Sequence, residues 1–389
     1  MSELVLHIGM PKTGTSALQT FFTTNRGRLA ESGWAYPEMI VRSKIHNGEF
    51  LMRYCLGLTK DDAANPQLQN LEENMRRLTS ALTAYEHVLI SEENFYVAPT
   101  WRSSQDIENS VQKFWEAVSR TVKEFSVSQT TIILYIRRQD EWLYSFWKQR
   151  PKIGVRIEPF DDFIANNRFG HILHYYELID TIERAFDGSC EAVVRLYDRT
   201  QFEGGDIFHD FCHAAGISWD SEFAIPKEKI NPSLTLDVAE ALRPFYNVAP
   251  PGSPLRNKLL IPLAYALSEQ APDPLEITPY KKGEATSIVQ AYESDNRKLA
   301  KRFFGRDELF PTVDNNRIVW EPNLERIAEC RELFQKECDS YNRHLKLSDI
   351  KVFGARCKNK AIRTLRAIKG KLDAWQTKPK QGVSTHERQ

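Results

Sequence analysis

The feature that most constrains this chain is a glycine-containing loop near its amino end, set between a predicted strand and a predicted helix. Residues 4–8 form a short apolar run whose length and β-branched content favour a buried strand. Residues 16–22 have the pattern of a helix, and Gly9 and Gly14 bracket the loop. Such a loop can aim several backbone N–H groups at one anion, and the start of the helix adds a favourable dipole. The segment therefore predicts an anion-binding site in an α/β fold.

Short apolar strands alternate with amphipathic helices over the first half of the chain. This alternation is typical of an α/β fold in which helices cover a central, mostly parallel sheet. Together with the loop, it predicts a P-loop-type three-layer sandwich. After about residue 220 the strand signals fade, so a C-terminal helical extension is expected. We predict strands at residues 4–8, 87–91, 130–136 and 192–197, and helices at 16–22, 68–82 and 111–125.

The chain is predicted to fall into three parts. Residues 1–220 form the core, residues 221–350 a helical extension or lid that completes it, and residues 351–389 a basic tail. The whole chain carries 52 Lys and Arg against 52 Asp and Glu. The tail alone contains eleven basic and two acidic residues, so its charge of +9 is balanced by −9 on the remainder.

The basic tail contains a segment, residues 360–375, with the pattern of an amphipathic helix. A helix of this kind can lie on an anionic membrane surface, or it can dock through its apolar stripe on the acidic body of the same chain. Both interpretations stay open, and the residues after Trp375 are expected to be disordered. The apolar face consists of Ile362, Leu365, Ile368 and Leu372.

Composition argues against several classes of protein. No run approaches the roughly 18 apolar residues that a membrane span needs, and the amino end lacks the features of a secretory signal. The six cysteines are scattered without a C-x-x-C pair, which indicates reduced thiols rather than disulfides or a zinc site. We therefore expect a cytoplasmic protein without a metal, with peripheral contact at the inner membrane face as an option through residues 360–375.

The loop differs from the nucleotide-binding pattern G-x-x-x-x-G-K-[ST] at one decisive position. Thr15 stands where a lysine is expected, and the loop's lysine is Lys12. This disfavours a site that hydrolyses ATP or GTP, where the lysine reaches the β- and γ-phosphates beside magnesium. A donor with a single 5'-phosphosulfate needs less charge neutralised, so Lys12 could suffice there. A P-loop kinase that uses ATP and magnesium stays as an alternative.

Residues 11–16, Pro-Lys-Thr-Gly-Thr-Ser, resemble the 5'-phosphosulfate-binding loop of sulfotransferases that use 3'-phosphoadenosine-5'-phosphosulfate (PAPS), commonly written P-K-[ST]-G-[ST]-[ST]. The resemblance implies that PAPS is the donor and that no metal is required. It also implies that Lys12 contacts the bridging oxygen and stabilises the leaving 5'-phosphate. The phosphate would be cradled by the loop residues Thr13, Gly14, Thr15 and Ser16.

A second, independent match follows the strongest predicted strand. The family's 3'-phosphate site has an arginine at a strand end and a serine eight residues later, a spacing that Arg137 and Ser145 reproduce. Arginine can donate two N–H groups to one phosphate. Arg138 is the rival, and Arg138 and Gln139 depart from the Asn-Pro that often follows the family's arginine. Tyr197, at the end of the fourth strand, stands where the family often has a tyrosine near the adenine.

Sulfuryl transfer also needs a general base within reach of the acceptor. In the family this is a histidine or a glutamate that follows an early core strand. Glu93 fits the bacterial pattern S-x-E-N best, with Glu92 as the alternative, although either could instead cap a helix or form a salt bridge. His46 is the other candidate, although a single histidine is more often structural. The sequence leaves the choice between these three residues open.

The resemblance covers about residues 4–217, and residues 294–310 resemble a C-terminal element of bacterial members. The chain is therefore expected to be a sulfotransferase that moves a sulfuryl group from PAPS to a hydroxyl or an amine. The expected acceptor is a carbohydrate or a lipid-linked glycan precursor, and no nucleic-acid partner is expected. A non-catalytic nucleotide-binding scaffold for glycan modification is a further alternative beside the kinase.

Overall fold

The computed structural model describes residues 2–41, 44–58, 70–97, 107–153, 158–166, 169–226, 233–250, 252–274 and 277–344. These residues fall into two compact units, and neither unit is a continuous stretch of chain. Unit 1 comprises Met1–Phe146, Asn166–Pro232 and Tyr280–Asn316, and unit 2 comprises Trp147–Ala165, Ser233–Pro279 and the described residues from Arg317 on. The division at residues 220 and 350 stays a prediction, and the helix predicted at 360–375 lies outside the described residues.

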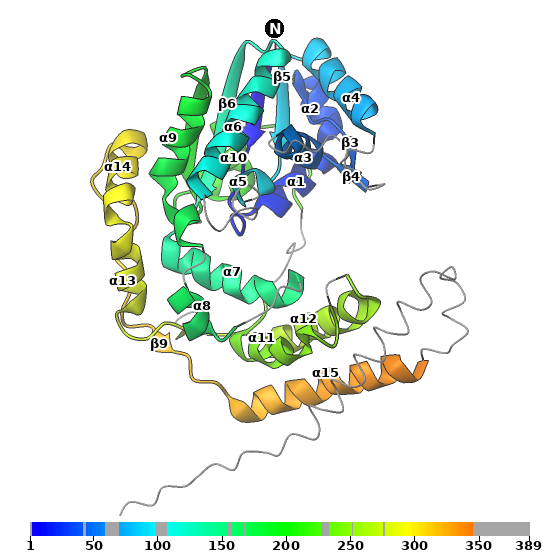
Figure 1. Ribbon diagram of the computed structural model, residues 1–389, viewed down its shortest axis with the longest axis vertical. Helices are drawn as coiled ribbons and strands as arrows, with labels where there is room; N and C mark the ends of the chain where they lie inside the picture. Colours follow the sequence, from blue (N-terminus) through cyan, green and yellow to red (C-terminus); the bar gives the residue numbers. More distant parts are fainter. Residues whose placement is uncertain are drawn as a thin grey trace, which may run out of the picture. The chain divides into compact units, whose positions relative to one another are not determined.

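Unit 1 is built on a five-stranded sheet. Its strands are β1 (Glu3–His7), β2 (Trp34–Ala35), β5 (His87–Ser91), β6 (Gln129–Ile136) and β7 (Cys190–Leu196). Every neighbouring pair is parallel, in the order β2-β5-β1-β6-β7. Figure 1 labels β5 and β6 of this sheet. Leu6 of β1 pairs with Ile90 on one side and Ile132 on the other, and all three side chains are buried. The predicted α/β class with a parallel sheet is confirmed.

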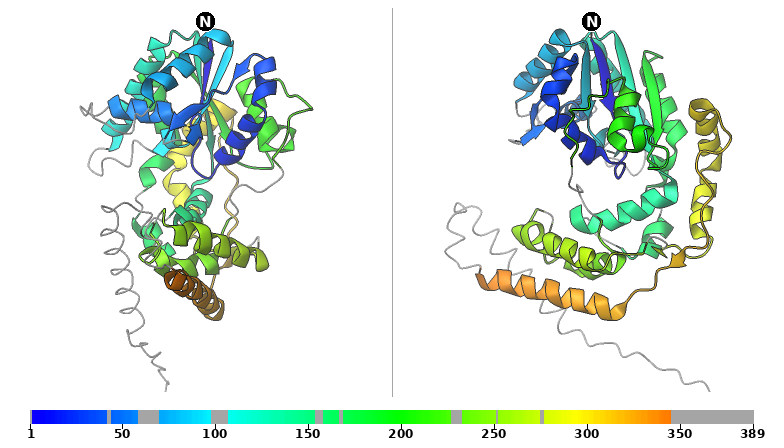
Figure 2. Two further views of the ribbon diagram at one scale, coloured as in Figure 1. Left: turned by 90° about the vertical axis from the view of Figure 1, so that its right-hand side faces the viewer. Right: turned by 180° about the vertical axis from the view of Figure 1, so that it is seen from behind.

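Helices cover both faces of this sheet, α1 (Thr15–Thr24) and α10 (Ile207–Ala215) on one, and α6 (Ile107–Glu124) and α9 (Tyr175–Ala185) on the other (Figure 2). Phe22 of α1 and Phe211 of α10 meet edge to face, with ring centroids 5.0 Å apart. Tyr135 of β6 stacks on Phe211, which joins this layer to the sheet. Strands covered on both faces read as continuous apolar runs, which is why the sequence revealed them.

The other elements of unit 1 are mostly short. They are α2 (Arg26–Glu31), the antiparallel pair β3 (Met39–Val41) and β4 (Lys44–His46), α3 (Glu49–Leu58), α4 (Leu71–Ala84), α5 (Asn94–Val97), the 3₁₀ turns η3 (Gly170–Leu173) and η4 (Glu203–Gly205), α13 (Glu284–Ala291) and α14 (Glu293–Phe304). The helix α7 (Gln139–Ile153) belongs to unit 1 in its first half and to unit 2 in its second. The predicted helices correspond to α1, α4 and α6, whereas β2, β3 and β4 were not predicted because each has only two or three residues.

In the described residues, unit 2 consists of helices and one pair of two-residue parallel strands. Buried Arg256 donates from Nη1 to the carbonyl of Ala249 at 2.7 Å. No helix of the described chain is long and apolar enough to cross a membrane. The elements are α8 (Phe160–Asn166), α11 (Leu236–Leu242), η5 (Arg243–Tyr246), the π-helical turn η6 (Arg256–Leu260), α12 (Ile261–Gln270), β8 (Ile277–Thr278), β9 (Ile318–Val319) and α15 (Leu324–His344).

A buried carboxylate joins α10 to the two strands at one side of the sheet. Asp210 accepts from Tyr135 Oη of β6 and from Nε of Arg195 of β7, the latter at 3.2 Å. It also accepts from the backbone N–H of Glu203 at 2.8 Å. Asp210 is 1% exposed and the buried Tyr135 hydroxyl has no access to water, whereas the Arg195 side chain is 27% exposed.

We predict that Asp210→Ala lowers the free energy of unfolding by about 3–5 kcal/mol, because it leaves the Arg195 charge and the Tyr135 hydroxyl without their partner. Urea denaturation followed by circular dichroism measures this change. The control is Asp220→Ala, which removes an exposed partner of Arg28 at 3.1 Å and should change the free energy by less than about 1 kcal/mol. Equal effects of the two substitutions would contradict the role assigned to Asp210.

Candidate functional site at the carboxyl edge of the sheet

The carboxyl ends of four neighbouring strands carry most of the residues that the sequence singled out. These residues are Glu92 and Glu93 after β5, the loop 9–14 after β1, Arg137 after β6 and Tyr197 after β7. Because the strands are adjacent and parallel, all these positions lie along one edge of the sheet. The structure thus brings together predicted residues that are up to 188 positions apart in the sequence.

The loop and Arg137 flank the point at which the strand order reverses. From β1 the chain passes to β2 and β5 on one side, whereas from β6 it passes to β7 on the other. Ligands of open parallel sheets bind in the crevice outside the carboxyl ends of the strands at such a reversal. β1 and β6 are hydrogen-bonded neighbours, so the segments that follow them lie next to each other at the carboxyl edge of the sheet.

The loop has a folded backbone that its own bonds and α7 hold in place. Lys12 and Gly14 adopt left-handed conformations, with φ of 73° and 82°. The hydroxyl of buried Thr13 donates to the carbonyl of Met10 at 2.5 Å, which closes the turn. Nε1 of Trp142 donates to the carbonyl of Pro11 at 2.7 Å. A left-handed backbone conformation costs roughly 1–2 kcal/mol at a lysine, so these hydrogen bonds stabilise a strained turn.

Glycine is required at both positions of the loop because neighbouring side chains lie too close to leave room for a Cβ atom. A Cβ at Gly9 would lie 2.3 Å from Oγ1 of Thr15. A Cβ at Gly14 would lie 2.5 Å from Cδ1 of Ile207 and 3.0 Å from Cε2 of Tyr197. The loop is therefore packed against α1, α10 and the end of β7, which fixes the direction of its N–H groups.

The start of α1 has the properties of an anion site. Gly14 is its N-cap and offers no side-chain oxygen to the first N–H groups of the helix. Thr15 is 3% exposed, and within the described residues its Oγ1 has no hydrogen-bond partner. A buried hydroxyl without a partner costs about 1–3 kcal/mol, so a polar ligand in the loop would relieve it. Ser16 is half-buried on the same first turn.

The two neighbouring arginines have different environments. Arg138 is 8% exposed and donates to Asp140 from Nε at 2.6 Å and from Nη2 at 3.0 Å. Arg137 is 25% exposed, and its Nε donates to Glu141 at 3.2 Å. Arg138 therefore stabilises the start of α7, whereas Arg137 reaches toward the edge of the sheet. This difference agrees with the preference for Arg137 over its neighbour.

Tyr197 lies beside both the loop and Arg137. Its backbone N–H donates to the carbonyl of Ile136 at 2.7 Å, and its ring centroid is 5.8 Å from the guanidinium carbon of Arg137. The ring also packs against the core of unit 1. Ser145 is half-buried on α7, two turns after the helix begins at Gln139.

The two glutamates after β5 differ in their contacts. Glu92 is 7% exposed and accepts from the backbone N–H of Asn94 at 3.0 Å and from its Nδ2 at 2.6 Å. Burial raises the pKa of Glu92 to about 7, against the effect of the Asn94 bonds. Burial also raises the pKa of Glu93, and the positive charge of Lys12 opposes that rise. Glu93 is therefore the carboxylate that interacts with the loop, and Glu92 forms a turn.

His46 is the last residue of β4, and its backbone pairs with that of Met39. Its side chain lies outside the described residues. The next residue, Asn47, donates from Nδ2 to the carbonyl of Leu89 at 3.2 Å and accepts from the N–H of Ser91 at 2.5 Å. These bonds attach the segment after β4 to the end of β5. Asn47 was not predicted from the sequence.

Two further residues support the loop in a way that the sequence did not predict. His7, the last residue of β1, is fully buried, and its Nδ1 lies 2.9 Å from Oγ of Ser91. Burial lowers its pKa to about 3, so it is neutral beneath the loop. Trp142 is fully buried, and its Nε1–H donates to the carbonyl of Pro11. A polar residue at the end of an apolar strand was the available signal for His7.

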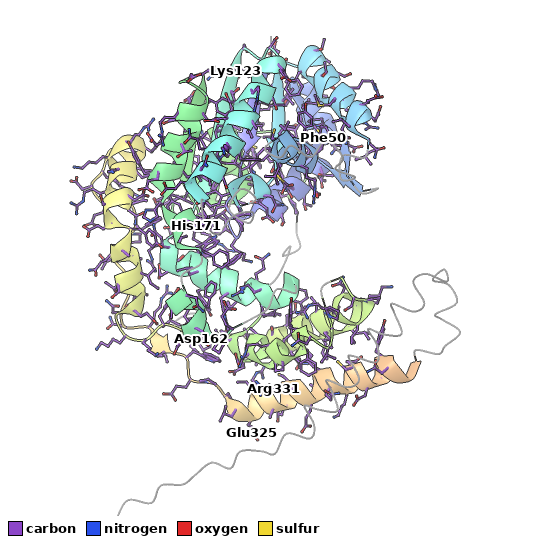
Figure 3. The ribbon with its side chains drawn as sticks, viewed as in Figure 1. Phe50, Lys123, Asp162, His171, Glu325 and Arg331 are labelled. Carbon is purple, nitrogen blue, oxygen red and sulfur yellow. The ribbon has the colours of Figure 1, made fainter. Side chains whose placement is uncertain are left out.

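A polar pocket of about 810 Å³ lies beside the amino ends of α6 and α9. Its wall includes Tyr96, whose N–H donates to the carbonyl of Glu93 at 3.1 Å, and His171 of η3, which is labelled in Figure 3. His174 and Glu177 line this pocket, and together with Asp295 they bring possible metal-ligand atoms within 4.8 Å of one another. Both oxygens of Asp295 already accept hydrogen bonds from backbone N–H groups of α9, so helix capping explains the position of this carboxylate.

The pKa of Glu92 gives a stability prediction. Because the folded pKa of about 7 lies above the ordinary value of 4.5, the folded state holds this proton more tightly, and stability is lost as pH rises from about 4.5 through 7. Glu92→Gln should therefore raise the free energy of unfolding at pH 8 by about 1–3 kcal/mol and leave it nearly unchanged at pH 4.5. Urea denaturation at both pH values tests this, and a destabilised variant at pH 8 would contradict it.

No protein-family model and no solved structure matches this chain. An uncharacterized protein of Archaeoglobus fulgidus is 28% identical to it over 188 residues, which is 48% of this chain and 50% of that protein. The chain thus spans about half the length of this curated relative. Because the relative's name states no activity, the function has to be argued from the site.

Proposed function

We propose that this protein is a PAPS-dependent sulfotransferase with a P-loop-type sandwich. The observation that carries the proposal is the anion-binding loop at the reversal of strand order, with Arg137 at the end of the adjacent strand. PAPS carries one anionic group at each end of its ribose, and two separate anion contacts suit it. Thr15 supports the assignment further, because its buried hydroxyl lacks a partner within the described residues.

In this proposal the loop 9–14 and the segment that follows β6 bind different phosphate groups of the donor. The N–H groups of residues 13–16, with the hydroxyls of Thr15 and Ser16, would hold the 5'-phosphosulfate. Arg137, helped by Ser145, would hold the 3'-phosphate, and Tyr197 would lie near the adenine. Neighbouring strand ends are about 4.8 Å apart, a separation that one nucleotide can bridge with its two phosphates.

The proposed reaction needs one base and one cation. The acceptor oxygen or nitrogen forms a bond to sulfur while the bond from sulfur to the 5'-phosphate oxygen breaks, and the electron pair leaves with the phosphate. Glu93 takes the acceptor's proton, and Lys12 stabilises the negative charge that develops on the 5'-phosphate. The raised pKa of Glu93 makes it a stronger base than an ordinary carboxylate.

We assign the acceptor class to a carbohydrate or a lipid-linked glycan precursor, following the resemblance to bacterial members. A cytoplasmic enzyme that meets such acceptors at the inner membrane face would suit the basic segment 360–375, which is outside the described residues. The kinase alternative keeps the loop but requires ATP with magnesium, so donor binding separates the two.

We expect calorimetry to detect binding of the product 3'-phosphoadenosine-5'-phosphate without magnesium, and Arg137→Ala to weaken it by at least tenfold, because a charge-assisted phosphate contact contributes about 1.5–3 kcal/mol. Arg26→Ala is a matched control, since Arg26 also pairs with a glutamate and lies 5.6 Å from a tyrosine ring. It should bind the nucleotide like the wild type. Binding of ATP alone, and only with magnesium, would favour the kinase instead.

We expect Glu93→Gln to lower turnover by about 100-fold or more while nucleotide affinity changes by less than about twofold, because a base acts on the acceptor. Turnover is measured as sulfate transfer from PAPS to the best acceptor in a panel of mono- and oligosaccharides. In the wild type it should rise with pH until Glu93 is deprotonated and then level off. Loss of turnover in Glu92→Gln with normal turnover in Glu93→Gln would overturn this assignment.

A further inference from the structure

A buried amide pair joins the segment that follows β6 to a helix far away in the sequence. Nε2 of Gln139 donates to Oδ1 of Asn296 at 2.7 Å, and Nδ2 of Asn296 donates to Oε1 of Gln139 at 3.3 Å. Gln139 is fully buried and Asn296 is 6% exposed. The two side chains satisfy each other, so removing either amide leaves the other buried without this partner.

Other hydrogen bonds hold the same short segment from two sides. The hydroxyl of Tyr175 donates to the carbonyl of Arg137 at 2.6 Å, and the hydroxyl of Tyr280 donates to the carbonyl of Asp140 at 2.7 Å. Both tyrosines are buried and both belong to unit 1, as do Gln139 and Asn296. Residues 137–140 are therefore fixed by side chains from α9, from the turn before α13 and from α14.

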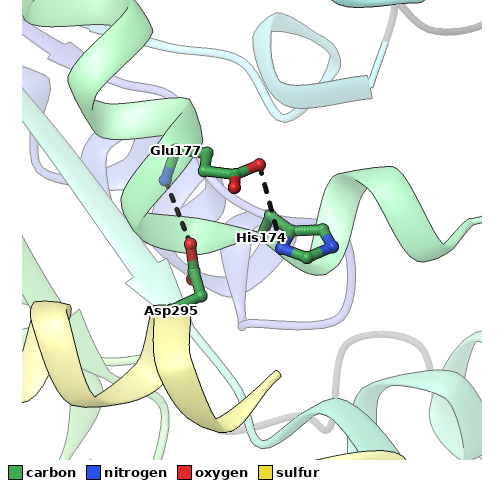
Figure 4. Close-up of side chains that lie close together, drawn as sticks. All are labelled: His174, Glu177 and Asp295. Carbon is green, nitrogen blue, oxygen red and sulfur yellow. Dashed lines mark hydrogen bonds and ion pairs between the residues drawn. The ribbon is translucent and has the colours of Figure 1, made fainter. Parts of the chain in front are cut away.

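The residue before Asn296 fixes α9 as well. Asp295 accepts from the backbone N–H of Tyr176 at 3.0 Å and of Glu177 at 3.2 Å, which caps the start of α9. Figure 4 shows the bond to Glu177, whose carboxylate faces His174 at 3.8 Å. Because α9 begins with Tyr175, neighbouring residues of α14 hold both Gln139 and the helix that binds the Arg137 carbonyl.

We propose that Asn296 is a positioning residue for the donor's 3'-phosphate, acting through Gln139 on the backbone that carries Arg137. The inference rests on the proposed function. An arginine contacts phosphate with two N–H groups only when its backbone is held within about 0.5 Å of the productive position. The amide pair supplies that restraint from α14, so α14 contributes to donor selectivity without touching the donor.

The experiment compares two nucleotides that differ only in the 3'-phosphate, namely 3'-phosphoadenosine-5'-phosphate and adenosine 5'-phosphate. Calorimetry on the full chain, without magnesium, gives the ratio of their dissociation constants. This ratio isolates the 3'-phosphate contact, because general damage to the fold or to the 5'-phosphate loop weakens both nucleotides. Circular dichroism and thermal melting establish that each variant is folded.

Asn296→Ala and Gln139→Ala should each lower the preference for the 3'-phosphorylated nucleotide by about tenfold, while affinity for adenosine 5'-phosphate stays within about twofold. In an Arg137→Ala background, Asn296→Ala should have no further effect on the ratio. The reciprocal exchange of Gln139→Asn with Asn296→Gln keeps two amides over the same total length and should recover most of the preference. Ser294→Ala, an exposed change on the same helix, is the control and should behave like the wild type.

The outcomes separate this inference from the proposal on which it rests. If the wild type prefers the 3'-phosphorylated nucleotide and Arg137→Ala abolishes that preference, but Asn296→Ala retains it, the positioning role of Asn296 is overturned alone. An equal loss for both nucleotides in Asn296→Ala also overturns it, since the amide pair would then serve only the fold. If the wild type binds the two nucleotides equally well, the result contradicts both the proposed donor site and this inference.

Discussion

The hydrogen bonding of β1 on both of its edges is the constraint on which the candidate site depends. The register pairs His7 with Ser91 on one side and with Ile133 on the other. Because the loop starts two residues after His7, this register sets the position of Lys12 relative to Glu93. A slip of one residue would exchange the faces on which the side chains of β1 lie and separate buried His7 from Ser91, so packing on both faces and this contact select the register. The site thus inherits its geometry from the packing of the sheet.

Burial and charge act against each other at this edge. The proposed anionic donor needs positive charge at its site, yet Glu93 interacts with Lys12 of the loop, and a second carboxyl group, Glu92, precedes Glu93 in the chain. Burial raises the pKa of Glu92 to about 7, so near neutral pH this group carries only part of a negative charge. Glu93 is the carboxyl whose charge interacts with Lys12. In the proposed reaction Glu93 serves as the base, and Glu92 adds only part of a second negative charge at this edge because burial favours its protonated form.

How far the sequence could predict this site depends on whether each feature is local. The strands were predictable because apolar runs covered on both faces are continuous, and the loop because Gly9 and Gly14 have a spacing that few folds need. The bond between Gln139 and Asn296 was not predictable, since an amide pair 157 residues apart leaves no local pattern. The role of Trp142 depended on whether its N–H found a partner, and only the fold brings it to Pro11.

The two adjacent arginines show how contacts in the fold decide which side chain remains accessible to a ligand. Sequence offers Arg137 and Arg138 as near equals at the end of one strand. Both residues follow the end of β6, and their side chains differ in burial, with Arg138 8% exposed and Arg137 25% exposed. Arg138 meets Asp140 and is buried with it, which leaves an ion pair that would be costly to break for a ligand. Arg137 keeps a quarter of its side chain exposed while its own carbonyl is held by Tyr175. A fixed backbone and a partly exposed guanidinium suit the phosphate contact that we propose for Arg137, whereas Arg138 stabilises the start of α7.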